Sequence, residues 1–242
     1  MPRVGTRKLY KLIKPELEKR NIKLGRDGLF DYLRKQGLLV KPTKSYTKTT
    51  NSKHWMKKHE NLLKEFQPSA PEQVFVSDIT YVESAQGVHY LSLVTDAYSR
   101  RIMGYELSDE MKATDVVKAL QMTIEQREYQ CQSIHHSDRG LQYCSKVYQD
   151  MLDENDMKPS MTGGYDCYEN ALAERVNGIL KQEFLLYKCN TLSELRALVE
   201  ESVFIYNEMR PHSSLGLKTP NQVHKKRPGA EAPSLIKTVN LF

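Results

Sequence analysis

The stretch Val74-Phe75-Val76-Ser77-Asp78-Ile79-Thr80-Tyr81 decides the fold class of this chain. Its β-branched and aromatic residues are typical of a buried strand, and Asp78 is its one acidic residue. A buried carboxylate is costly unless it is paired, hydrogen-bonded or bound to a cation. Asp78 is therefore a candidate functional residue, although an Asp that faces water from an edge strand gives the same pattern.

The segments that follow this strand predict a mixed sheet with helices around it. Two further short strands, at 88–96 and 101–107, suggest an antiparallel meander. Beyond them, helical and extended patterns alternate: helices at 114–127, 146–155, 172–184 and 192–207, and strands at 133–136 and 158–161. Strands first, then alternating helices and strands, predict an α/β fold with a mixed sheet flanked by helices.

The front of the chain is strongly basic. Residues 1–70 hold 18 Lys and Arg against 6 Asp and Glu, whereas the remainder holds 18 against 24. Such a block favours a polyanionic partner, and nucleic acid is the commonest one in a cytoplasm, although a merely solvated basic face looks the same.

Two helices are expected within this basic front. The first covers residues 5–22, where Pro15 bends or splits the run, and Gly25 interrupts the pattern. The second covers residues 28–36, with Asp27 as its cap and Gly37 at its end. Helix, glycine turn and helix are compatible with a helix-turn-helix that binds DNA, and many helical hairpins share the pattern. The basic residues of the second element are Arg26, Arg34 and Lys35.

These differences in composition and in predicted secondary structure divide the chain into four parts. Residues 1–52 are a basic helix-turn-helix-like module that ends in a linker at 41–52, and residues 53–72 are a connecting helix (53–66) and a hinge. Residues 73–225 form the core domain, and residues 226–242 form a tail. A small α-helical module therefore precedes the larger α/β domain.

Composition excludes several other classes of protein. Hydrophobic residues make up 39% and charged residues 27%, there is no apolar run of membrane-spanning length, and the amino terminus lacks the layout of a secretory signal. The cysteines show no metal-ligand spacing and are expected to be reduced thiols: Cys131, Cys144, Cys167 and Cys189. We expect a cytoplasmic protein.

Two more carboxylates stand at positions where functional groups occur. Asp138 follows the expected strand at 133–136, at a junction where α/β proteins place functional residues, although an Asp there can simply form a turn. Glu174 shares the polar face of the expected helix 172–184 with Asn177 and Lys181, and a solvated helix face looks identical.

The three carboxylates together favour a catalytic interpretation. Three carboxylates from two strands and one helix can jointly hold two divalent cations about 4 Å apart. This is the arrangement for in-line displacement at phosphorus. Mg²⁺ keeps several waters, so three protein carboxylates suffice for it. Lys181 could then hold a DNA phosphate.

Four ordered motifs give the chain a family resemblance. These are residues 78–81 (Asp-Ile-Thr-Tyr), 136–143 (His-Ser-Asp-Arg-Gly-Leu-Gln-Tyr), 169–174 (Glu-Asn-Ala-Leu-Ala-Glu) and 206–215 (Tyr-Asn-Glu-Met-Arg-Pro-His-Ser-Ser-Leu). With 35 residues between Asp138 and Glu174, the chain resembles the integrase-core transposases of bacterial insertion sequences, in particular the second-reading-frame product of two-frame elements, related in their core to retroviral integrases.

The resemblance implies a fold, a reaction and partners. It implies an RNase H-like core whose acidic triad is Asp78, Asp138 and Glu174, holding two Mg²⁺ ions for which Mn²⁺ can substitute. The reaction would be cleavage at the ends of the element, followed by strand transfer, without a covalent enzyme intermediate. The expected partners are the terminal inverted repeats, target DNA, other copies of the chain and the upstream-frame product, with the protein associated with the nucleoid and not with a membrane.

The same motifs supply secondary candidates for DNA contact: Lys181, Asn177, Arg139, Tyr143, Arg210 and His212, beside Arg26, Arg34 and Lys35 of the basic front. The adjacent His135 and His136 could be metal ligands, but hydrogen bonding or DNA contact is favoured because no further ligands follow at suitable spacing.

Two rival functions are compatible with parts of this pattern. A pure DNA-binding protein would show no metal-dependent activity. A nuclease for RNA–DNA hybrids would share the fold, but that class generally adds a fourth carboxylate and needs no separate basic module. The basic front favours transposition.

Overall fold

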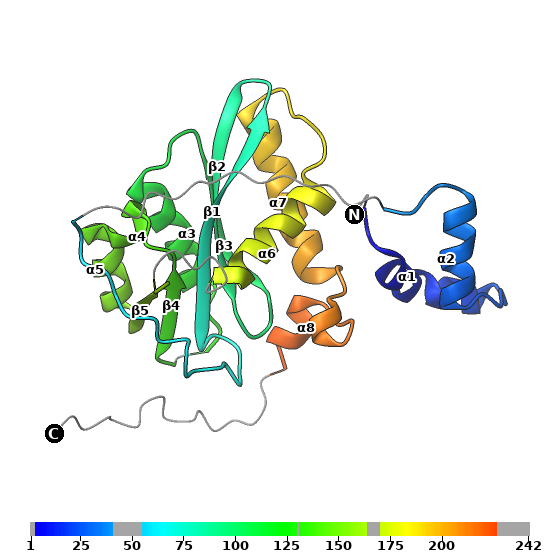
Figure 1. The fold of residues 1–242 in the computed structure, drawn as a ribbon, viewed down its shortest axis with the longest axis horizontal. Coiled ribbons are helices and arrows are strands. Elements are labelled where there is room, and N and C mark those ends of the chain that lie inside the picture. Colours follow the sequence, from blue (N-terminus) through cyan, green and yellow to red (C-terminus); the bar gives the residue numbers. More distant parts are fainter. Residues whose placement is uncertain (1–2, 41–54, 130, 164–169, 227–242) are drawn as a thin grey trace. The chain divides into compact units, whose positions relative to one another are not determined.

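The computed structural model describes residues 3–40, 55–129, 131–163 and 170–226 (Figure 1). Two compact units emerge from its contacts. One comprises Met1–Lys48, Glu83–Gly87 and Gly178–Val223, and the other comprises Thr49–Val82, Val88–Asn177 and His224–Phe242. The predicted linker at 41–52 lies outside the described residues, as does the tail except residue 226. The predicted division at residues 52, 72 and 225 stays a prediction.

A five-stranded sheet forms the centre of the larger unit, with the strand order β3-β2-β1-β4-β5. The strands are β1 (Val74–Ser84), β2 (Gly87–Asp96), β3 (Ile102–Ser108), β4 (Ser133–Ser137) and β5 (Met157–Met161). β2 and β3 are antiparallel, while β4 lies parallel to both β1 and β5. Two residues join β1 to β2, a connection that only antiparallel strands allow. The sheet is therefore mixed, as predicted.

Three helices cover one face of this sheet (Figure 1): α3 (Ala113–Glu125), α4 (Leu141–Cys144) and α5 (Lys146–Glu154). Their apolar residues pack with Phe75, Val94 and Met103 of the strands in one buried cluster. Gly104 lies so close to α3 that an added Cβ would overlap the backbone of Ala119. A side chain at this position would push β3 and α3 apart.

The opposite face of the sheet packs against α6 (Ala171–Ile179). Val74 and Val76 of β1 form a second buried cluster there with Ile134 and Ala173. Because successive side chains of a strand alternate between the two faces, Asp78 shares this face with Val74 and Val76. The strand pattern thus directs Asp78 toward the helix that carries Glu174.

A buried acid–base network joins residues that are distant in sequence. Glu72, Asp96 and His224 are fully buried. His224 lies 3.2 Å from Glu72 through Nε2 and 3.5 Å from Asp96 through Nδ1, and Ser99 Oγ lies 3.0 Å from that same Nδ1. Burial alone would lower the pKa of the His224 imidazole, but its hydrogen bonds to Asp96 and Glu72 raise it above the ordinary value.

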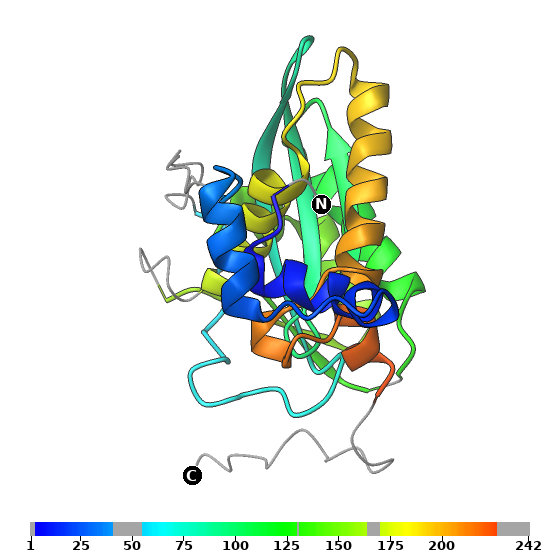
Figure 2. The same cartoon turned by 90° about the vertical axis from the view of Figure 1, so that its right-hand side faces the viewer.

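The smaller unit is helical. It contains α1 (Thr6–Lys19), α2 (Arg26–Lys35), the π-helical turn η2 (Leu180–Phe184), α7 (Leu192–Glu208), the short 3₁₀ turn η3 (Ser213–Leu215) and most of α8 (Pro220–His224). α1 and α2 pack together, and α7 is the long gold helix of Figure 2. Thr191 caps α7 by accepting the N–H of Glu194, whose carboxylate accepts the N–H of Asn190 in return.

Several sequence predictions need correction. α1 runs through Pro15 without a break, and α2 begins after Gly25, so Asp27 lies in its first turn and is not the cap. Gly37, with φ +68°, ends α2 as predicted. Residues 55–66 form turns, bends and irregular backbone where a helix is predicted. Across the described part of the chain, no helix has the length and apolar character needed to span a membrane.

Candidate active site

Strand pairing brings the first two carboxylates together. The parallel register of β1 and β4 pairs Val74 with Ile134 and Val76 with His136. Continued by two residues, it places Asp78 opposite Asp138, just beyond the carboxyl end of β4. Asp138 Oδ1 accepts the N–H of Gly140 over 2.9 Å, so the turn-forming role considered for this residue is also present.

Two asparagines of the α6 region hold the helix that carries Glu174 in place. Asn177 Nδ2 donates to Asp78 Oδ2 over 2.8 Å, and Asn170 Nδ2 donates to the carbonyl oxygen of Ser77 over 3.0 Å. Both asparagines are buried. They fix the segment that carries Glu174 against the strand that carries Asp78.

The charges of the three carboxylates interact. Burial, reinforced by the charges of Asp138 and Glu174, raises the pKa of Asp78 to about 7, against the opposing effect of the Asn177 hydrogen bond. Burial and the charge of Asp138 also raise the pKa of Glu174, whose side chain is exposed on α6. A cation would stabilise the charged forms of Asp78 and Glu174, which burial and neighbouring carboxylates disfavour.

The possible metal donors of this site are three carboxylates. Their oxygens are the hard ligands that Mg²⁺ prefers. Among the described residues, however, no three His, Cys, Asp or Glu side chains are placed to hold one ion together. The side chains would have to draw inward, or water would have to complete the coordination, and Mg²⁺ characteristically retains several waters. The donor set fits a hydrated divalent cation.

The adjacent His135 and His136 both serve as hydrogen-bonding core residues. His135 Nε2 lies 2.8 Å from Ser77 Oγ and 2.8 Å from Tyr148 Oη, and His136 Nδ1 lies 2.9 Å from Ser160 Oγ. Burial, and then the charge of His136, lower the pKa of His135 to about 3, so its imidazole is neutral. The hydrogen-bonding interpretation is confirmed for both.

Sequence comparison identifies the family. Two family models described as "Integrase core domain" match residues 68–167 and 155–220. The chain is 36% identical over 225 residues to the "Insertion element IS600 uncharacterized 31 kDa protein" of Shigella sonnei, covering 92% of this chain and 81% of that protein. It is 35% identical over 200 residues to "Transposase InsF for insertion sequence IS3A" of Escherichia coli (strain K12), covering 80% and 68%. The chain belongs to the integrase-core transposases of insertion sequences.

Solved structures share the fold of this transposase. The HTLV-2 integrase catalytic core domain in complex with magnesium superimposes with a TM-score of 0.52 at 19% identity, covering 65% of this chain and 99% of that one. A chain of the simian T-cell lymphotropic virus intasome gives 0.60 at 17% identity, covering 98% and 80%. The transposase therefore has an RNase H-like integrase core, and with its relatives it is a polynucleotidyl transferase of the DDE type.

Several residues that the sequence suggested as DNA contacts are buried and contact other residues of the transposase instead. Tyr143 is 2% exposed and belongs to the core, so the prediction of direct DNA contact is wrong for this residue. Its phenol has a pKa far above the ordinary value because of burial, then Tyr148, Asp78 and Asp138. Asn177 is likewise buried and donates to Asp78.

Arg210 and His212 form part of a buried cluster. The Arg210 guanidinium makes two 2.7 Å hydrogen bonds to the Glu183 carboxylate and lies 2.9 Å from His212 Nε2. Burial would raise the pKa of Glu183, but the bonds from Arg210 outweigh it and lower this pKa. Arg210 thus ties η2 to the end of α7, which does not fit a direct contact with DNA.

The remaining cationic candidates are accessible. Lys181 is exposed, Arg139 is partly exposed, and the basic residues of α2 are exposed. On α2, Arg26 pairs with Asp27, and Arg34 pairs with Asp31 and stacks over the ring of Phe30. Their contact with DNA, like that of Lys35, stays a prediction.

Proposed function

We propose that this transposase cleaves the ends of its insertion sequence and transfers them to target DNA, using Asp78, Asp138 and Glu174 to hold two Mg²⁺ ions. The observation that supports this proposal is the β1–β4 register, which pairs Val76 with His136 and, continued by two residues, would bring Asp78 level with Asp138. The magnesium complex of the HTLV-2 integrase core supports the choice of metal.

The bound ions would supply positive charge that stabilises the attacking and leaving oxygens of an in-line displacement. The protein residues would position the reactants. Asn177 fixes the orientation of Asp78, and Asn170 fixes the start of the segment that bears Glu174. Lys181, seven residues after Glu174, would bind a phosphate of the substrate.

Each step exchanges one phosphorus–oxygen bond for another. In cleavage, a water oxygen bonds to phosphorus, the bond to the 3′ oxygen breaks, and that oxygen takes up a proton to become a 3′-hydroxyl. In strand transfer, this 3′-hydroxyl loses its proton and attacks a target phosphodiester, whose own 3′ oxygen leaves. No protein side chain becomes covalently attached.

The substrate would be held by an assembly of chains on DNA. The HTLV-2 core has trimeric and dimeric forms, and the simian viral chain is part of an intasome, which supports an oligomer for the transposase. The exposed cations of α2 would contribute DNA binding. The upstream-frame product, separate or fused, would contribute further DNA binding and multimerisation.

The test is incubation of the transposase, with and without the upstream-frame product, with oligonucleotides that carry the inverted repeats and Mg²⁺ or Mn²⁺. We expect end-specific nicking and joining by wild type and neither by Glu174→Gln. Metal-independent binding without cleavage in every preparation would refute the enzymatic proposal and favour a DNA-binding role.

A further inference from the structure

Residues 55–66, which we call the strap, are fastened along the outer edge of the sheet. The N–H of Met161 on β5 donates to the carbonyl oxygen of Glu60 over 3.2 Å. The N–H of Leu62 donates to Ser160 Oγ over 2.9 Å. The strap is therefore attached to the edge strand at neighbouring positions, so its side chains are held at fixed places.

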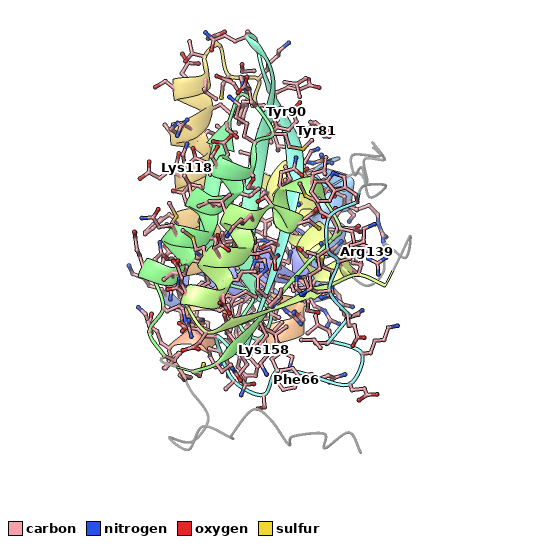
Figure 3. The ribbon with its side chains drawn as sticks, turned by 90° about the vertical axis from the view of Figure 1, so that its left-hand side faces the viewer. Phe66, Tyr81, Tyr90, Lys118, Arg139 and Lys158 are labelled. Carbon is pink, nitrogen blue, oxygen red and sulfur yellow. The ribbon has the colours of Figure 1, made fainter. Side chains whose placement is uncertain are left out.

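Apolar side chains fasten the strap to both faces of the sheet. Met56 packs against the cluster that includes Tyr143 and Tyr148, whereas Leu63 and Phe66 pack against the cluster on the opposite face. In Figure 3, the cyan backbone of this segment leads down to the labelled Phe66. The strap thus passes from the α5 side of the sheet to the α6 side.

The strap carries two cations directly after Met56, whose side chain packs against the cluster that contains Tyr143 and Cys144 of α4. Lys57 and Lys58 are exposed. The Cys144 thiol, whose pKa is raised by burial and by Asp138, also senses the opposing charges of Lys58 and Arg139. The part of the strap around Met56 therefore lies beside α4, which follows Asp138 in the chain, and Figure 3 shows Arg139 on the side of the molecule along which the strap runs.

Trp55, at the start of the strap, is almost entirely exposed. Its side chain is 91% accessible, and it is the one tryptophan of the sequence. The apolar anchor of the strap is the adjacent Met56, so the indole takes no part in its packing against the core. An exposed aromatic ring followed closely in the chain by two exposed lysines is a combination with which proteins bind single-stranded nucleic acid: bases stack on the ring while cations contact the phosphates.

We propose that the strap binds an unpaired DNA strand beside the active site, with Trp55 stacking on a base and Lys57 and Lys58 contacting phosphates. The proposal rests on the DNA substrate of the proposed function and adds a contact surface that precedes the catalytic core motifs. Arg139 would continue the same row of cations toward Asp138.

This surface distinguishes unpaired from paired DNA. In a duplex, the faces of all but the terminal bases are covered by their neighbours, so an unpaired end offers Trp55 more base faces than a blunt end does. Because the anchoring contacts hold the strap in place before DNA arrives, little ordering of this segment should oppose binding. The expected ligand is a DNA end whose last bases are unpaired.

The single tryptophan provides a direct measurement. We would add oligonucleotide duplexes, either blunt or with a short unpaired end, to the full chain in the absence of divalent metal. We expect Trp55 fluorescence to fall to a plateau, with tighter binding of the unpaired end. Glu174→Gln should show the same quenching, because stacking does not require catalysis.

Variants test each contact by the anisotropy of labelled DNA. Trp55→Ala should weaken binding of the unpaired end about tenfold or more, while Trp55→Phe should retain most of it. The double variant Lys57→Gln/Lys58→Gln should weaken the binding of all oligonucleotides. The dependence of its affinity on salt concentration should fall by the amount expected for about one to two phosphate contacts. The matched control is Lys112→Gln, an exposed lysine of the same unit, which should change neither.

Two results would overturn the proposal: unchanged Trp55 emission with an oligonucleotide that anisotropy shows to be bound, or equal affinity of wild type and Trp55→Ala for the unpaired end. Both differ from failure of the proposed function. Quenching without metal-dependent cleavage would refute the proposed chemistry and support the strap, whereas cleavage without quenching would do the reverse.

Discussion

The Asn177 side chain donates a 2.8 Å hydrogen bond to the Asp78 carboxylate, and through it the helix that carries Glu174 is bound to the strand that carries Asp78. Asn177 is one helical turn from Glu174, so the same helix turn supplies a carboxylate and fixes the orientation of another. This makes Asn177 a positioning residue.

Replacing Asn177 by Ala should reduce the rate of end nicking about tenfold or more, since a small displacement of a catalytic group has effects of this size. In the wild type, the hydrogen bond from Asn177 lowers the pKa of Asp78. Its removal should raise this pKa and move the acidic limb of the pH–rate profile to higher pH. Asn155→Ala, which removes an amide bonded to its own helix, is the control. An unchanged profile in the Asn177 variant would contradict the positioning role.

Mg²⁺ should stabilise the folded transposase through the three carboxylates. A ligand that binds only the folded state at about 100 times its dissociation constant adds roughly 2.7 kcal/mol to the free energy of unfolding. We expect thermal unfolding to shift upward with Mg²⁺ in wild type and much less in Asp78→Asn. The same upward shift in that variant would show that the ion binds elsewhere.

The buried His224 should make stability depend on pH. Its folded pKa is raised above the unfolded value of about 6.5, so its contribution is complete below pH 6.5 and is lost as pH rises through the folded pKa. His224→Gln should cost about 3 kcal/mol at pH 6, because Glu72 and Asp96 lose their buried cationic partner. Urea unfolding at pH 6 and pH 9 measures both effects. A variant with the pH dependence of wild type would disprove this assignment.

Gly104 tests the contact between β3 and α3. The Cβ of Gly104→Ala would overlap Ala119 and Thr123, and such overpacking should cost about 1–3 kcal/mol of unfolding free energy. The matched control is Gly178→Ala in α6, where an added Cβ meets nothing within 4 Å and helix propensity should make the change neutral or stabilising. Equal midpoints of chemical denaturation for the two variants would contradict the close approach.

Sequence patterns predicted most of the sheet because the residue patterns that mark its strands are local in the chain. The run from Val74 through Tyr81 is rich in β-branched and aromatic residues, as a buried strand should be, and the helices of the core begin and end within a few residues of the predicted bounds. The connecting helix predicted at 53–66 does not form over residues 55–66, where Leu63 and Phe66 pack against the sheet and the backbone bonds to β5.

The parts that sequence reasoning missed depend on partners that are distant along the chain. Asn170 and Asn177 bond to β1 residues more than 90 positions away, and His224 lies 152 positions from Glu72. Arg210 was predicted to contact DNA, but its guanidinium pairs with the Glu183 carboxylate. No local sequence pattern indicates this pairing. The three carboxylates were predicted from local patterns, since Asp78 is the one acidic residue of a strand-like run and all three lie in the family motifs.

The attachment of the strap to β5 also bears on how far this chain can be shortened. β5 is an edge strand, and an uncovered edge presents backbone groups that pair readily with other chains. A shortened chain that begins at residue 67 would keep the three carboxylates yet lose the segment that covers this edge, and it should self-associate as the concentration rises. A chain that begins at residue 55 would keep the cover, and is the better starting point for work on the core alone.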